Sequence, residues 1–127
     1  MKIPKWISPF FILAGLYDGI LGVIFVVTPD RLFDTFNVPP PNHPGYVQFP
    51  ALLLIVFAVM FFNIARHPAD SRNLIFYGVL LKASYCIIVF SYWFLGNMPN
   101  MWMPFAFCDL GFLVMFLISF FKLRHIA

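Results

Sequence analysis

Four long apolar segments divide the sequence, and they constrain the fold more than any other feature. Each is close to the roughly 20 residues that a helix needs to cross about 30 Å of hydrocarbon. Inside a bilayer the backbone polar groups must be satisfied within the segment itself, so each segment is predicted to be a helix. The predicted spans are residues 9–27, 46–65, 73–95 and 102–121. We therefore expect an all-α, integral membrane four-helix transmembrane bundle, with residues 1–127 forming a single transmembrane domain.

The composition supports a membrane protein and excludes several other classes. Hydrophobic residues make up 62% of the chain and charged residues 10%, whereas a soluble domain usually has about 25% charged residues. The formal net charge of +3 does not predict nucleic-acid binding, because the Lys and Arg residues are scattered around the apolar spans and form no patch. Cys86 and Cys108 both lie in apolar segments without a CxxC motif, so we expect neither a disulfide nor a zinc site.

The basic residues predict an orientation. Positive residues concentrate on the cytoplasmic side of membrane proteins. One side of the predicted bundle would carry Lys2, Lys5, Arg66, Arg72, Lys122 and Arg124, and the other side only Arg31. We therefore expect a multi-pass protein of the cell inner membrane, with both termini cytoplasmic. The loops at 28–45 and 96–101 would then face outward.

The first outer loop has a pattern of its own. In "TPDRLFDTFNV", apolar Leu32, Phe33 and Phe36 alternate with charged and polar residues. This pattern predicts a short interfacial helix at about 29–37. The Pro-rich "PPPNHPG" that follows would form a stiff, extended return. The predicted helix is interpreted as a lid over the outer end of the bundle, and the alternative is a surface that docks a partner or ligand.

Three ionisable residues lie inside the predicted spans. Asp18, Lys82 and Asp109 fall within roughly one helical turn of a common depth when each span is measured at 1.5 Å per residue. A charge at the centre of a bilayer costs about 3 kcal/mol on insertion scales, so none of the three should face lipid. We expect them in the bundle interior, in direct contact or bridged by water.

The charges of this cluster do not balance. With all three residues ionised, two carboxylates and one ammonium leave one net negative charge. We therefore expect one acid to hold a proton, or the site to hold a cation or a positively charged ligand group, as a property of the coupled cluster. Tyr85 lies three residues after Lys82 and shares its helix face, so it joins the candidate site. Tyr17 and Ser84 are expected to point elsewhere.

Three roles for the cluster remain open. It could hold the helices in register, bind a proton, ion or small ligand, or act as an acid–base catalyst. No cofactor is expected. Membrane haem needs histidines within spans, whereas His43, His67 and His125 lie in loops or the tail. No paired carboxylate and His residues suit a di-iron site, no cysteine pair suits a thiol–quinone enzyme, and no GxSxG or P-loop motif occurs.

Several short motifs resemble those of known proteins. "LYDG" in the first span, "VPPP" after the interfacial segment, Lys82 in the third span and "GNMPNMWMPFAFCDLGF" at 96–112 are found in the order given. Together they resemble small, uncharacterised four-span bacterial membrane proteins in the size class of DoxX-like proteins. The resemblance implies a four-helix bundle in a cell membrane and supplies no activity.

The function expected from the sequence is a small membrane protein with a buried Asp/Lys/Asp cluster, serving as a binding or accessory structural subunit. One alternative is a proton- or ion-coupled transporter or channel, and another is a lipid-modifying acid–base enzyme. The expected partners are the lipid bilayer, a small polar or lipid ligand, and further copies of the chain or a larger membrane complex. No nucleic acid is expected.

Overall fold

The computed structural model describes residues 3–124 and is helical, with no strand in that part of the chain. It confirms the predicted all-α bundle of four long helices. In chain order the elements are α1 (Ile7–Val27), α2 (Arg31–Thr35), α3 (Gly45–Arg66), α4 (Arg72–Phe94), the 3-10 helix η1 (Asn100–Trp102) and α5 (Met103–Lys122). Each of α1, α3, α4 and the η1–α5 unit is long and apolar enough to cross a membrane.

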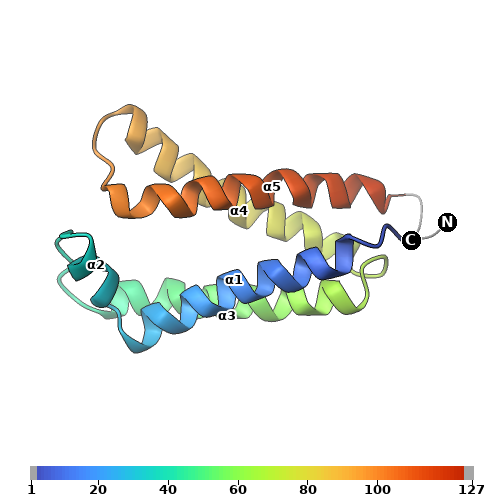
Figure 1. Cartoon of the computed structure of the whole chain (residues 1–127), viewed down its shortest axis with the longest axis horizontal. Helices are drawn as coiled ribbons and strands as arrows, with labels where there is room; N and C mark the ends of the chain where they lie inside the picture. Colours follow the sequence, from blue (N-terminus) through green and yellow to red (C-terminus); the bar gives the residue numbers. More distant parts are fainter. Residues whose placement is uncertain (1–2, 125–127) are drawn as a thin grey trace.

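The four long helices form two antiparallel pairs. α1 packs closely along α3, and α4 crosses α5, whereas α3 and α4 contact each other far less (Figure 1). The two pairs are close together where α1 begins and α5 ends, and they separate toward the end that carries α2. We call the end where α1 begins and α5 ends the opposite end, and the end that carries α2 the α2 end. The angle between the pairs positions the candidate site.

Small residues allow the close approach of α1 and α3. A Cβ added to Gly22 of α1 would lie 2.7 Å from the backbone oxygen of Ala51 and 2.7 Å from the Ile55 side chain on α3. Helices in membranes associate through such close packing of small residues. Gly22 is therefore a point where the two backbones nearly touch.

The interior contains two separate apolar clusters. At the opposite end the rings of Phe11 and Phe116 stack with centroids 4.9 Å apart, and Phe61 lies 5.1 Å from Phe116. All three side chains are fully buried. A second cluster at the α2 end combines buried Phe25, Phe33, Ala51 and Met101. The candidate site lies between these two clusters.

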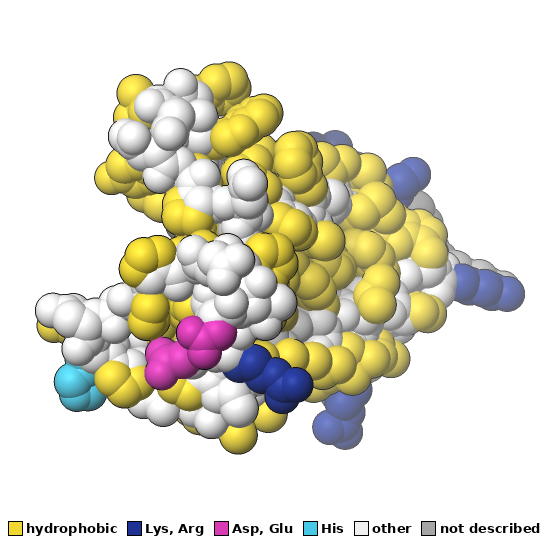
Figure 2. All heavy atoms as spheres, turned by 60° about the vertical axis from the view of Figure 1, so that its left-hand side comes forward, with side chains coloured by type: hydrophobic (Ala, Val, Ile, Leu, Met, Phe, Trp, Pro, Cys, Tyr) yellow, Lys and Arg dark blue, Asp and Glu magenta, His cyan; other side chains and the backbone are white. Residues whose placement is uncertain are grey.

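The outer surface of the helices is apolar. Figure 2, which brings the α2 end forward, shows hydrophobic side chains over the flanks of the bundle. The Lys, Arg and acidic side chains seen in this view lie at the two ends, and the basic ones at the far end outnumber those beside α2. This distribution suits helices surrounded by hydrocarbon.

The helix in the first loop is shorter than predicted. The sequence pattern predicted a helix at 29–37, whereas α2 spans only Arg31–Thr35. The helix ends because Asn37 adopts a left-handed backbone conformation (φ 56°), which is a common helix terminator. Phe33 is 4% exposed, and its ring centroid lies 5.7 Å from that of Trp102. α2 therefore packs over one end of the bundle.

The close approach at Gly22 gives a first prediction. Gly22→Ala should lower the free energy of unfolding by roughly 1–3 kcal/mol, because the added methyl group meets backbone that cannot move aside. The measurement is thermal or denaturant unfolding of the purified protein in detergent. Gly111→Ala on α5 is the matched control, since a Cβ there meets nothing within 4 Å. Equal loss of stability in both variants would contradict the close-packing interpretation.

Candidate functional site

The structure brings the three predicted ionisable residues into direct contact. The Nζ atom of Lys82 donates hydrogen bonds to Oδ1 of Asp18 at 2.8 Å and to Oδ1 of Asp109 at 3.1 Å. Asp18 lies on α1, Lys82 on α4 and Asp109 on α5, so the Lys82–Asp18 salt bridge joins the two helix pairs and the Lys82–Asp109 salt bridge lies within the α4–α5 pair. The exposed fractions of the side chains are 1% for Lys82, 1% for Asp18 and 12% for Asp109.

Aromatic rings surround the ammonium group. Nζ of Lys82 lies 5.2 Å from the ring centroid of Phe112, 5.4 Å from that of Tyr17 and 5.8 Å from that of Phe61. These distances are within the range of cation–π attraction. The ammonium is therefore held by two carboxylates and surrounded by three aromatic rings, and it is closed off from solvent.

The cluster is not fully satisfied by its own hydrogen bonds. Oδ2 of Asp18 and the hydroxyl of Tyr17 are buried and have no hydrogen-bond partner among the described residues. A buried polar atom without a partner costs about 1–3 kcal/mol, and more when it is charged. Such atoms are rare in folded proteins, and they often mark a place where another molecule or a proton completes the network.

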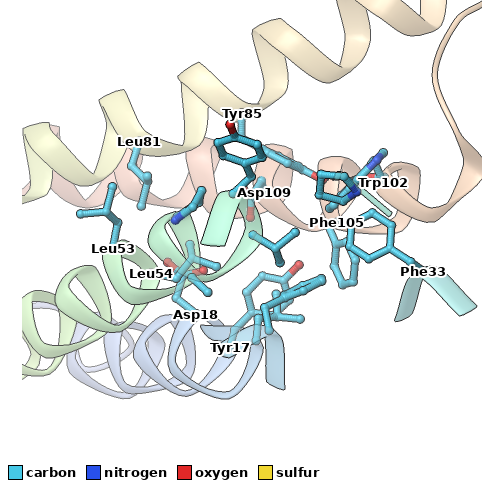
Figure 3. A pocket seen from close by; sticks show the side chains of 17 residues that line it. Tyr17, Asp18, Phe33, Leu53, Leu54, Leu81, Tyr85, Trp102, Phe105 and Asp109 are labelled. Atoms are coloured by element: carbon cyan, nitrogen blue, oxygen red, sulfur yellow. Dashed lines mark hydrogen bonds between the residues drawn. The ribbon is translucent and has the colours of Figure 1, made fainter. Parts of the chain in front are cut away.

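A cavity of about 510 Å³ adjoins the cluster on the side of the α2 end. Asp18 and Asp109 line its inner end, and nearly all the rest of its wall is apolar or aromatic. Figure 3 shows how the labelled residues surround this space, with Tyr17, Asp18, Leu53, Leu54, Leu81, Tyr85 and Asp109 toward the inner end and Phe33, Trp102 and Phe105 at the other. Lys82 itself does not line the cavity.

The cavity opens sideways, on the flank of the bundle. The lining residues of α3 include exposed ones, Tyr46 at 68% and Leu53 at 42%. Leu81 and Tyr85 on the α4 side are half-buried. The exposed part of the cavity wall therefore lies on α3, with the half-buried α4 residues across the cavity from it. Phe33 of α2 and Trp102 of η1 close the cavity toward the α2 end.

Tyr85 lines the same cavity but does not bind the ionic cluster. Its hydroxyl donates a hydrogen bond of 3.0 Å to the backbone oxygen of Trp102. This bond connects α4 to the start of α5. The ring therefore contributes wall area to the cavity, and the hydroxyl holds the α4–α5 pair together.

The expectation that Tyr17 points away from the cluster is wrong. Tyr17 lines the cavity, and its ring lies near the Lys82 ammonium. Neighbouring helix positions differ by about 100° in direction, which is too small an angle to remove a large side chain from a wide cavity. A face shared by Tyr17, Leu21 and Phe25, which recur every four residues, was the available signal in the sequence. Ser84 does point away, and its exposed hydroxyl donates to the Leu80 carbonyl.

No other feature of the described chain competes with this site. Within residues 3–124, no group of three His, Cys, Asp or Glu side chains could hold a metal ion. Cys86 is buried, Cys108 is exposed, and neither forms a disulfide. A shallow second pocket on the α1–α3 flank is lined without a single charged side chain. The ionic cluster with its cavity is therefore the candidate functional site.

Comparisons with known proteins add no relative. The chain matches no protein-family model, no curated protein and no solved structure. The case for function therefore depends on the geometry of the site.

The salt bridges give a second prediction. Lys82→Met should destabilise the fold by roughly 3–5 kcal/mol, because it leaves two buried acids without their cation. The triple variant Asp18→Asn, Lys82→Met and Asp109→Asn should recover much of that loss, because it removes all three charges together. Both are measured by unfolding in detergent against the parent. If the single and triple variants are both as stable as the parent, the three residues are not energetically coupled.

Proposed function

We propose that this chain is a small multi-pass binding protein that takes up an apolar, drug-sized or single-chain ligand from the bilayer. The observation that carries the proposal is the apolar cavity of about 510 Å³ that ends at a buried ionic cluster. Ligand cavities in proteins commonly measure about 300–1,000 Å³ and combine apolar walls with a few convergent polar groups. An ionisable residue inside a membrane is also, by default, a candidate functional residue.

The lateral mouth supports entry from the bilayer. Phe33 and Trp102 block the cavity at the α2 end. At the opposite end, the stacked rings of Phe11 and Phe116 fill the interior between the helices. The exposed lining residues Tyr46 and Leu53 of α3 mark the open flank, and a molecule dissolved in hydrocarbon would reach it directly. A ligand entering there would meet apolar walls first and the carboxylates last.

The charge distribution supports an orientation in the cell inner membrane with both termini cytoplasmic. Arg66, Arg72 and Lys122 mark helix ends at the opposite end of the bundle, whereas α2 carries a single Arg31. Arg72 is anchored there, since its Nε donates to the Phe120 carbonyl at 2.7 Å. This asymmetry follows the positive-inside rule. Kinship with the four-span proteins in the DoxX-like size class is part of the same proposal and adds no activity to it.

The unbalanced charge favours a second candidate function. A cluster of two acids and one base that binds and releases a proton would serve a proton- or ion-coupled transporter, assembled from several copies of the chain. Transport requires a path from the cluster to both faces of the membrane in turn. In this conformation the aromatic clusters close both ends, so the binding function has the stronger support.

Ligand binding in the cavity is the third prediction, and Trp102 provides the reporter. An octanol carrying bromine at the far end of its chain should quench Trp102 fluorescence in a saturable way, because Trp102 lines the cavity. Asp109 lies seven residues further along the chain than Trp102, roughly 10 Å of helix rise, which suits a chain of this length. The measurement is a titration in nanodiscs of neutral phosphatidylcholine.

Matched variants define the outcome. Leu54→Phe adds bulk to the cavity wall and should weaken binding about tenfold, equivalent to ~1.4 kcal/mol. Leu52→Phe is the control, since Leu52 lies on the same helix, is 50% exposed and does not line the cavity. Trp102→Phe should remove the saturable component. Quenching that rises linearly in all variants would reflect partitioning into the bilayer and would refute the proposed function.

A further inference from the structure

The inner end of the cavity presents acids and hides the base. Asp18 and Asp109 line the cavity, whereas Lys82 does not. The Lys82 ammonium is surrounded by the rings of Tyr17, Phe61 and Phe112, of which only Tyr17 lines the cavity. A ligand head arriving at this end therefore meets the two carboxylates that line the cavity.

Hydrogen-bond acceptors remain free at the same place. Lys82 uses Oδ1 of both carboxylates, while Oδ2 of Asp18 has no partner. Tyr17 also lines the cavity, and its hydroxyl, which has no hydrogen-bond partner among the described residues, can accept a hydrogen bond as well as donate one. Asp109 is the more accessible acid, with a side chain 12% exposed. These atoms suit a head that donates several hydrogen bonds.

The charge balance selects the sign of that head. Two ionised carboxylates and one ammonium leave the cluster with one surplus negative charge. In surroundings of low dielectric constant, attraction to a cation is much stronger than in water. A head with one positive charge would make the site neutral, whereas a carboxylate or phosphate would add a second unpaired negative charge. Aromatic walls, including the rings of Tyr17 and Tyr85, add favourable contacts for a cation.

We propose that the cavity recognises a protonated amine attached to an apolar chain, with the ammonium bound between Asp18 and Asp109 and the chain directed toward Trp102. This inference rests on the proposed binding function and specifies its ligand class. The ammonium could belong to a single-chain amine or to the head of an aminophospholipid. The size of the cavity favours the single-chain amine, because a two-chain phospholipid is far larger than the space.

The test compares three head groups, an amine, an alcohol and a carboxylate, on the same eight-carbon chain. Octylamine, octanol and octanoate compete with the brominated octanol for Trp102 in neutral phosphatidylcholine nanodiscs at pH 7. Octylamine should compete about tenfold more strongly than octanol, because its hydrogen bonds are charge-assisted. Octanoate should be the weakest competitor. If octylamine competes no better than octanol in the parent protein, the amine proposal is overturned.

Variants of the protein test whether Asp109 gives rise to the preference for octylamine over octanol. Asp109→Asn should reduce the advantage of octylamine over octanol to near equality while octanol itself still binds. Asp34→Asn on α2 is the control, because Asp34 is exposed and does not line the cavity. If Asp109→Asn does not fold, the ranking of the three heads in the parent still decides the proposal. An unchanged amine preference in a folded Asp109→Asn protein would overturn the assignment.

Two further outcomes separate the proposals. Saturable binding of the brominated octanol without any amine preference would leave the binding function standing and refute the amine. Absence of saturable binding by every probe, octylamine included, would refute both. Replacing phosphatidylcholine with phosphatidylethanolamine then identifies the source of the amine. Loss of octylamine binding in that bilayer indicates an aminophospholipid head, and unchanged binding indicates a single-chain amine.

Discussion

The contact between Lys82 and two carboxylates is the interaction on which the rest of the bundle depends. Asp18 belongs to the α1–α3 pair and Asp109 to the α4–α5 pair, while direct contact between α3 and α4 is slight. A hydrogen-bonded ion pair also requires its partners to lie at the same depth along the bundle. Sliding α4 by one helical turn, about 5.4 Å, would withdraw the ammonium from both acids. The cluster therefore determines that the two helix pairs pack against each other, and it determines the register in which they do so.

The same cluster divides the interior into a filled half and a hollow half. On one side Phe11, Phe61 and Phe116 fill the space between the helices. On the other side the helix pairs diverge, and α2 with η1 closes the resulting cavity at its end. Because the two carboxylates line the hollow half and Lys82 does not, the cluster has a polarity that a simple structural salt bridge does not need.

The spans and the ionic cluster could be predicted from the sequence because both depend on local features. The length of an apolar run predicts a spanning helix, and a charge within that run predicts a buried partner at the same depth. The cavity could not be predicted this way. It results from the angle between the helix pairs, and residues such as Leu54 or Phe105 that line it look no different in sequence from residues that face lipid. Tyr17 was misjudged for the same reason, and the extent of α2 was overestimated because the left-handed conformation of Asn37 was not anticipated.

Because the three charged residues lie on helices made at different times, the cluster has a consequence for biogenesis. Chains are synthesised from the N-terminus, so α1 enters the membrane with Asp18 long before Lys82 exists. An uncovered acid at that depth costs about 3 kcal/mol, which favours its neutral, protonated form during this interval. The tight fit of Gly22 against Ala51 lets α1 and α3 associate without the cluster. Lys82 then arrives with α4, and Asp109 arrives last, so the ionised network forms only when the final helix has been inserted.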